Sequence, residues 1–421
     1  MSRIASPISR RRVLRAAGVA ALTAPAIITR VLAESLSPLG PIRPDQLPDP
    51  NFALLSPTNP FRVGVRPHRK TGVRLELVGS PLSTPSGTKY LIHNYGHSGA
   101  GITLSWGCAS IVVDHVATVI HDMRGTRLAP SVAVLGTGVI GLTVATELRR
   151  KWPKLPITVY AKDLNVQNTT SHIAGGQFEP SFIVKEYENA HDTETLVGYL
   201  KRANDRIEEI ATSSTRQRIA FGIAQRFNYT LDQGSPGLNF CVANTVLDPF
   251  KTGTLPFAHL KSEGRQFDTW LIDPTILLPK LVADLHRNRV RFVQRVFDRT
   301  HNPITNVAES IIVNCTGYAA KDLVDDDQPM IARRGHLVAL QKTMLRQWYF
   351  LSGGCANDDQ IIMYVFCRAN DIVVGGTQQD GNDSTTVGPD DMPIFKRIIE
   401  NAAAVFGGDV SHCVMPNPNV A

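Results

Sequence analysis

The clearest pattern in the chain is a short apolar run, a glycine-rich turn and an amphipathic stretch in succession. Residues 131–135 (SVAVL) are typical of a buried strand, residues 142–150 have helical periodicity, and residues 157–161 (ITVYA) are typical of a second strand. A further apolar run at residues 311–317 ends in Gly317. A strand, a helix and a strand within about 30 residues predict a βαβ unit in a parallel sheet.

The turn of this unit has the spacing of a dinucleotide-binding loop. Gly136 permits a tight turn, Gly138 lets a pyrophosphate approach the backbone, and Gly141 lets the helix pack on the sheet. Val139 and Ile140 lie at the start of the helix, whose N-terminus attracts phosphate. We therefore predict a dinucleotide site rather than a merely structural glycine turn.

The residues that follow the second strand leave the ribose contact open. Lys162 comes first and Asp163 second, whereas an acid usually follows this strand directly. Lys162 alone would even permit a phosphorylated ribose. An NAD(P)-linked dehydrogenase is therefore an alternative at this point.

Two other segments carry small and polar residues suited to a flavin. Residues 168–180 form a polar turn that opens onto small residues, a backbone that can lie flat against an isoalloxazine ring. Residues 93–103 form a glycine-rich loop that enters an apolar helix over 104–120, whose N-terminus would favour negative charge. The candidate cofactor contacts in these segments are Thr169, Thr170, Ser171, Gly175, Gly176, Ser98, Gly99, Gly101, Ile102 and Thr103. His93 and His97 lack a third ligand at suitable spacing, so we predict no metal site.

Composition and charge change this picture little. The chain has 421 residues, of which 43% are hydrophobic, so it can bury a large core and is expected to form two domains. Its net charge of +7 comes largely from six arginines within residues 1–33, a stretch without acids. No nucleic-acid surface is therefore expected. The six cysteines form no CxxC pair and indicate neither a disulfide framework nor zinc.

The N-terminus resembles a twin-arginine signal peptide. Residues 9–15 (SRRRVLR) precede an apolar run over 16–28, and Val31-Leu32-Ala33 follows, small enough at its end for signal peptidase. The alternative is a membrane anchor, but this run is shorter than the roughly 20 apolar residues that span a bilayer. We expect residues 1–33 to be recognised by the twin-arginine translocase and the protein to be periplasmic or secreted. Residues 34–60 contain seven prolines and predict an extended arm.

Six segments together resemble the D-amino-acid oxidase family of FAD-dependent oxidoreductases. They are HNYGHSGAGITLSWGCA (93–109), GVRPHRKTGVRLE (64–76), GTGVIGL (136–142), TTSHIAGGQFEP (169–180), VNCTG (313–317) and VVGGTQQDGN (373–382). The resemblance implies an α/β fold, with a Rossmann-like FAD-binding domain and a substrate domain built on a mainly antiparallel sheet. It implies FAD as the cofactor.

The order of the segments differs from that of the family, in which the GxRPxR and HNYGH segments close the chain. Here residues 61–130 carry them and precede the FAD-binding unit of 131–180. The substrate domain is expected at 181–265 and 330–380, a return to the FAD-binding domain at 266–329, and a closing segment at 381–421. Every piece occurs once, as in a circular permutation; rearrangement in the gene model is the alternative.

The resemblance also implies the substrate contacts. Arg66 matches the arginine that grips the substrate α-carboxylate, Tyr364 matches a tyrosine that also binds it, and Gly99 matches the glycine whose carbonyl receives the amine. Tyr364 is expected in an antiparallel hairpin that turns at 367–371. Gln360 stands where vertebrate-type members have a lid tyrosine. Gln378 stands where members with acidic substrates tend to have arginine, which disfavours D-aspartate unless Arg333, Arg334 or Arg368 compensates.

The implied reaction is oxidative deamination of a D-amino acid, with a neutral side chain expected. The substrate Cα–H would transfer as hydride to flavin N5, giving a 2-oxo acid, ammonia and, with oxygen as acceptor, hydrogen peroxide. Another electron acceptor is possible. The alternatives are an FAD-dependent enzyme for another amine or hydroxy acid, and a flavin-binding protein without activity.

Overall fold

The structure is a computed structural model that describes most of the chain. The described residues are 42, 47–85, 87–126, 128–180, 182–231, 235–323, 328–343, 349–351 and 361–408. The predicted signal at 1–33 and Gln360 lie outside the described residues. Our expectations about them therefore remain predictions.

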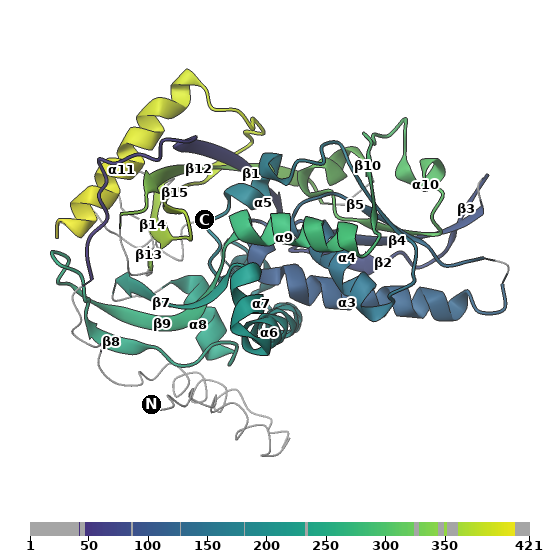
Figure 1. Cartoon of the computed structure of the whole chain (residues 1–421), viewed down its shortest axis with the longest axis horizontal. Coiled ribbons are helices and arrows are strands. Elements are labelled where there is room, and N and C mark those ends of the chain that lie inside the picture. Colours follow the sequence, from purple (N-terminus) through teal and green to yellow (C-terminus); the bar gives the residue numbers. More distant parts are fainter. Residues whose placement is uncertain are drawn as a thin grey trace, which may run out of the picture.

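A largely parallel sheet forms one half of the molecule, to the right in Figure 1. Its order is β10-β6-β5-β11-β4-β2. Its strands are β10 (Arg291–Gln294), β6 (Ile157–Ala161), β5 (Val132–Leu135), β11 (Ile311–Asn314), β4 (Gly87–Tyr95) and β2 (Arg74–Leu77). All neighbours pair in parallel except β2, which pairs antiparallel with β4, as does β3 (Leu82–Thr84). The predicted βαβ unit is confirmed, because β5 and β6 are fully buried parallel strands joined through a helix.

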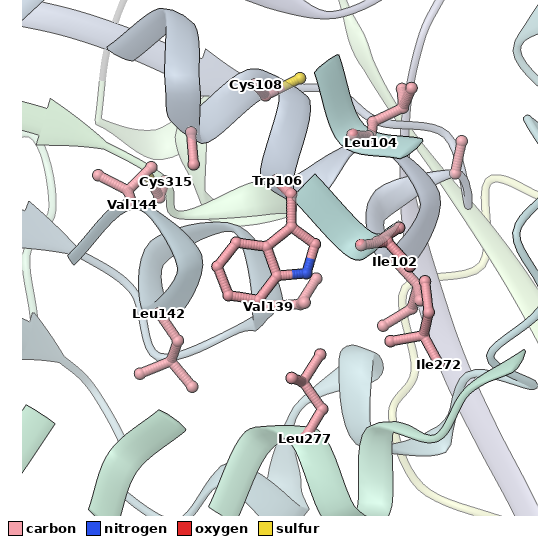
Figure 2. Close-up of a cluster of buried hydrophobic side chains, with 14 of the residues drawn as sticks. Ile102, Leu104, Trp106, Cys108, Val139, Leu142, Val144, Ile272, Leu277 and Cys315 are labelled. Carbon is pink, nitrogen blue, oxygen red and sulfur yellow. The ribbon is translucent and has the colours of Figure 1, made fainter. Parts of the chain in front are cut away.

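Helices α3 (Gly101–Asp122) and α4 (Val139–Lys151) pack on this sheet. Helix α6 (Ala190–Ser213) packs in turn on α3, and α9 (Pro274–Arg287) packs on α4. Figure 2 shows Trp106 of α3 at the centre of a cluster formed with side chains of α4 and α9, and its exposed fraction is 0%. By length and composition α3 would suffice to cross a bilayer, but it is 61% buried and packs against α4 and α6 as a core helix.

A second, mainly antiparallel sheet forms the other half. Its order is β1-β12-β15-β14-β13-β7-β9-β8. Its strands are β1 (Phe61–Arg69), β12 (Met330–Gln341), β15 (Asp371–Thr377), β14 (Ile361–Cys367), β13 (Tyr349–Leu351), β7 (Ile223–Leu231), β9 (Glu263–Ile272) and β8 (Lys251–Thr254), and β16 (Gln379–Asp380) pairs with β12. Only the β13–β7 pairing among them is parallel. Helix α11 (Met392–Phe406) packs on β12, β14 and β15. The predicted fold class and the hairpin carrying Tyr364 are confirmed.

The remaining elements are short helices of three to eight residues. They are η1 (Val166–Asn168), α5 (Thr170–Ile173), η2 (Val184–Tyr187), α7 (Thr215–Ala220), α8 (Pro236–Ala243), α10 (Pro303–Asn306), η3 (Gly317–Asp322) and η4 (Pro389–Asp391). Strand β9 stays in the antiparallel sheet as far as Ile272 and so passes the boundary that we place at residue 265.

Segments far apart in the sequence lie side by side in both sheets. Strand β1 pairs with β12 along nine residues (Figure 1). Strand β4 pairs with β11. The segment before β1 packs on α11, since the ring centroids of Phe52 and Phe406 are 5.6 Å apart and those of Phe61 and Phe395 are 4.8 Å apart. The start of the described fold thus adjoins its last helix.

Candidate active site

One cavity of about 1790 Å³ brings together the predicted cofactor and substrate residues. Its wall includes the loop between β5 and α4, the loop before α3, helix α5, and parts of β1, β12 and β14. The carboxyl ends of β5 and β11 meet at this wall, as is usual for ligand sites of parallel sheets. The cavity extends to Arg66 and Tyr364 of the antiparallel sheet.

The nucleotide end of the cavity is built from backbone at close approach. Gly136 has φ +112°, and a Cβ there would lie 2.6 Å from the carbonyl oxygen of Cys315. A Cβ at Gly141 would overlap with the carbonyl oxygen of Gly136, so this glycine serves helix packing. A Cβ at Gly138 would meet only the Ser171 hydroxyl, at 3.3 Å. Gly138 therefore leaves room for a ligand beside the helix N-terminus.

Most of the predicted cofactor residues lie on the cavity wall. They are Gly136, Gly138, Val139, Ile140, Lys162, Asp163, Thr169, Thr170, Ser171, Gly175, Gly176, Gly317, Gly99, Gly101 and Ile102. Gly141, Ser98 and Thr103 do not lie on the wall. The hydroxyl of Thr103 instead donates to the carbonyl of Glu179 at 2.7 Å, and Ser98 is fully buried. Direct side-chain contact of these three residues with a ligand in the cavity is not supported.

Asp163 is engaged within its own loop. One carboxylate oxygen accepts from the backbone N–H of Asn165 at 2.8 Å, and the other accepts from the Asn168 amide at 2.6 Å. These hydrogen bonds lower the pKa of Asp163. The structure thus gives Asp163 a loop-shaping contact that the sequence did not reveal, on the wall where a ribose contact is expected.

Several buried polar atoms on the wall have no protein partner among the described residues. They are both amide atoms of Asn94, Nε2 of His97 and Nε2 of Gln177. Burial lowers the pKa of His97 to about 3, so its ring is neutral at ordinary pH. Orphaned buried polar groups cost stability, and a polar ligand in the cavity would satisfy them. The wall therefore fits a large cofactor with both polar and flat apolar parts.

At the other end of the cavity, Arg66 on β1 is held by three neighbours. Its Nη1 donates to the carbonyl of Thr377 at 2.8 Å, and its charge interacts with the hydroxyl of Tyr364. Its guanidinium lies over the Phe182 ring, 4.9 Å from the centroid. Burial lowers the pKa of Arg66 and raises that of Tyr364. The two predicted carboxylate-binding residues are thus brought together, beside an aromatic ring that the sequence analysis missed.

Glycines make room for this pair. A Cβ at Gly99 would lie 2.8 Å from Cδ of Arg66, and a Cβ at Gly335 would lie 2.5 Å from its Nη2. A Cβ at Gly375 would overlap with the Tyr364 ring. Gly99 also has φ +101°. The loop before α3 therefore lies directly on Arg66, which places the predicted amine acceptor beside the predicted carboxylate donor.

A hydrogen bond that the sequence did not predict ties this loop to β1. Ser98 has φ +51°, unusual for a residue other than glycine. Its hydroxyl lies 2.7 Å from Nδ1 of His68, and its N–H donates to the carbonyl of Pro67 at 2.9 Å. Burial lowers the pKa of His68 to about 4, so the ring is neutral at ordinary pH. We call the His68–Ser98 hydrogen bond the loop latch.

Of the three arginines that could compensate for Gln378, one lies on the cavity wall and two do not. Arg334 pairs with Asp391 at 2.5 Å and Arg368 with Asp371 at 2.6 Å, and neither lies on the cavity wall. Arg333 does lie on the wall, directly opposite Arg66 in the β1–β12 ladder. Its charge is matched by Asp380, with contacts of 2.7 and 3.0 Å.

Comparisons with known proteins identify the family of the chain. Residues 131–416 match the family model described as FAD dependent oxidoreductase. The D-amino-acid oxidase of Streptomyces coelicolor is 25% identical over 286 residues, which cover 65% of this chain and 77% of that protein. The D-amino-acid oxidase of Rubrobacter xylanophilus is 56% identical over 48 residues, only 11% of this chain and 13% of that protein.

Among solved structures, L-proline dehydrogenase from P. horikoshii has a TM-score of 0.48 at 15% identity, covering 67% of this chain and 78% of that one. The family model covers more than half of the chain, and the predicted cofactor is confirmed with it. The conclusion rests on the nucleotide loop, on the buried polar wall atoms that have no described protein partner, and on the family match. The chain belongs to the FAD-dependent oxidoreductase family of the D-amino-acid oxidases and is an enzyme that uses FAD.

Proposed function

We propose that the protein catalyses the oxidative deamination of D-amino acids. The observation that carries this proposal is the placement of Arg66, Tyr364 and Gly99 at one end of the FAD cavity. A guanidinium is the planar two-pronged donor suited to a carboxylate, and the tyrosine hydroxyl adds a further hydrogen bond. The Gly99 carbonyl is an acceptor for the amine. Three fixed contacts of this kind would orient the Cα–H of the substrate.

The chemistry divides between the chain and its cofactor. Bound FAD supplies a two-electron acceptor and returns the electrons to oxygen, giving hydrogen peroxide, or to another acceptor. The substrate loses a hydride from Cα and a proton from its amine, and becomes the imino acid. Water then hydrolyses the imino acid to the 2-oxo acid and ammonia. The residues of the chain bind and orient the substrate, and this proposal requires no side chain to act as a base.

We further propose that the preferred side chains are uncharged. Gln378 lies on the cavity wall and carries no charge. The charge of Arg333, the one arginine among the three that reaches the wall, is balanced by Asp380. A second substrate carboxylate beside Arg66 would therefore meet an Arg333 that is already paired with Asp380.

The experiment is a substrate panel on the purified, FAD-loaded protein. D- and L-amino acids, glycine and 2-hydroxy acids are compared by peroxide release and, without oxygen, by bleaching of the flavin absorbance. The proposal expects neutral D-amino acids to be the best substrates in both assays. Preference for L-amino acids or hydroxy acids, or no reduction by any D-amino acid, would contradict it. Bleaching of the flavin absorbance without peroxide release would show that the enzyme passes its electrons to an acceptor other than oxygen.

We also propose that residues 1–33 direct export of the folded, FAD-loaded protein through the twin-arginine translocase. The paired arginines and the following short apolar run support this proposal. Changing Arg10 and Arg11 to Lys should leave the protein in the cytoplasm. Unchanged export of that variant would remove the assignment.

A further inference from the structure

Two arginines face the same cavity from adjacent strands. Arg66 of β1 and Arg333 of β12 are directly opposite in an antiparallel ladder, so both side chains lie on the same face of the sheet. Both are part of the cavity wall. Like charges in this arrangement destabilise a sheet. Arg333 indeed lowers the pKa of Arg66, after burial and against the opposite effect of Tyr364.

Asp380 offsets this repulsion from the other side of β12. In the β12–β16 ladder, Asp380 is directly opposite Arg333. Its two carboxylate oxygens accept from Nε and Nη2 of Arg333 at 2.7 and 3.0 Å. The hydrogen bonds from Arg333 lower the pKa of Asp380, which is therefore ionised at neutral pH. The pair is a fork-to-fork contact of the strong, charge-assisted kind.

The two members of the pair differ in where they lie. The Arg333 side chain is 11% exposed and belongs to the cavity wall, whereas the Asp380 side chain is 45% exposed and does not. Gln378 lies on the wall beside Arg333, and its amide oxygen accepts from Nη1 at 3.2 Å in the orientation that satisfies both groups. The carboxylate thus neutralises a cavity cation from outside the cavity.

We propose that the Arg333–Asp380 pair determines the side-chain charge of the substrate. With Asp380 in place, Arg66 is the guanidinium at the substrate end of the cavity that no described carboxylate pairs with, and the cavity takes substrates with one carboxylate. Without Asp380, the guanidinium of Arg333 becomes a second carboxylate site, and dicarboxylic D-amino acids become substrates. This inference rests on the proposed function, because it takes Arg66 as the α-carboxylate site.

The test compares four variants with the wild type. Asp380→Asn removes the charge and keeps the size, and Arg333→Gln removes the cation. The double variant Asp380→Asn/Arg333→Gln removes both charges. Asp390→Asn is the matched control, because Asp390 is an exposed acid near Asp380 in the sequence that is not on the wall. The quantity measured is the ratio of kcat/KM for D-aspartate and D-glutamate to that for D-alanine and D-methionine.

We expect Asp380→Asn to raise this ratio about 10- to 100-fold, the effect of one charge-assisted carboxylate contact. The rise should be absent in the double variant and in Asp390→Asn. An unchanged ratio in a folded, FAD-loaded Asp380→Asn variant would overturn the proposal. A rise that persists in the double variant would also overturn it, because Arg333 would then not be the new site.

A binding measurement keeps the test independent of turnover. Calorimetric titration of the holoenzyme with succinate and with propionate gives the affinity for two carboxylates relative to one. Asp380→Asn should tighten succinate binding relative to propionate by a similar factor, and equal changes for both ligands would contradict the inference. Should Asp380→Asn fail to fold, Asp380→Ser removes the same charge and Asp380→Glu retains it. Absence of neutral D-amino-acid turnover in the wild type would instead reject the proposed function.

Discussion

The two ends of the cavity achieve their shape in different ways. At the nucleotide end, backbone approaches backbone: Gly136 lies against Cys315, and Gly141 lies against Gly136. At the substrate end, long side chains reach the cavity and are held by their neighbours, as Arg66 is by Thr377 and Tyr364. The first end tolerates no added atom at Gly136 or Gly141, whereas the second depends on individual hydrogen bonds and charges. Substitutions should therefore fail in different ways at the two ends.

The largest expected effect is at the nucleotide end. Gly136→Ala places a Cβ 2.6 Å from a backbone oxygen at φ +112°, so we expect a loss of about 3 kcal/mol or more in the free energy of unfolding, with loss of FAD. Gly138→Val should instead leave a folded protein without FAD, because within the chain its Cβ would meet only the Ser171 hydroxyl, at 3.3 Å, and the larger side chain would exclude the ligand. Thermal unfolding and FAD stoichiometry separate the two outcomes. Stoichiometric FAD in Gly138→Val would contradict this placement of the pyrophosphate.

The second-largest effect, on kcat/KM, is expected from changes to the loop latch at the substrate end. Ser98→Ala keeps the Cβ at φ +51° and removes the hydroxyl that His68 holds, so the loop carrying Gly99 should shift and kcat/KM should fall about 10-fold. Ser98→Gly also loses the hydroxyl but adopts this φ without strain, so its loss should be smaller. Wild-type kcat/KM in Ser98→Ala would show that the latch does not position the loop. Steady-state kinetics beside FAD occupancy make the comparison.

The latch also predicts a pH dependence of stability. Burial lowers the pKa of His68 from 6.5 to about 4, so the folded protein binds fewer protons than the unfolded chain between these values. The contribution of His68 is fully present above pH 6.5 and is lost as the pH falls toward 4. Denaturant unfolding at several pH values should show a shallower decline in His68→Gln than in the wild type. Identical declines in stability in the two proteins would show that His68 does not contribute to the pH dependence.

The smallest effect on folding and FAD binding is expected from moving residues 61–126 to the other end of the chain. We propose that the chain is a circular permutation of the family order. The family match begins at residue 131, and the ring contact between Phe52 and Phe406 brings the segment before β1 next to the last helix. A relinked chain that begins at residue 128 and carries residues 61–126 after residue 421 through a flexible linker should therefore fold and bind FAD. An insoluble or FAD-free relinked chain would contradict the proposal.

The same contrast explains what could be predicted from the sequence. The βαβ unit and its glycines were predictable, because a tight turn with backbone contacts demands a specific residue type at a specific spacing. The position of Arg66 beside Tyr364 was implied by the family segments. The Arg66–Arg333 opposition was not, because it depends on the register between two strands whose facing residues lie more than 260 residues apart in the sequence. The latch was not, because it depends on the conformation of the loop at Ser98, 30 residues from His68. No local pattern reports such a register, although the paired arginines at 333 and 334 were a signal worth following.

The central claim is that Arg66 grips the substrate carboxylate in the FAD cavity. Steady-state kinetics with a neutral D-amino acid, measured beside FAD occupancy for the wild type, Arg66→Ala and Arg66→Lys, test it most directly. A bidentate charge-assisted contact contributes roughly 2–4 kcal/mol, so Arg66→Ala should lose about 30- to 1000-fold in kcat/KM and Arg66→Lys should recover only part. FAD occupancy should stay near the wild-type value in both variants. Equal activity in all three proteins would contradict the account.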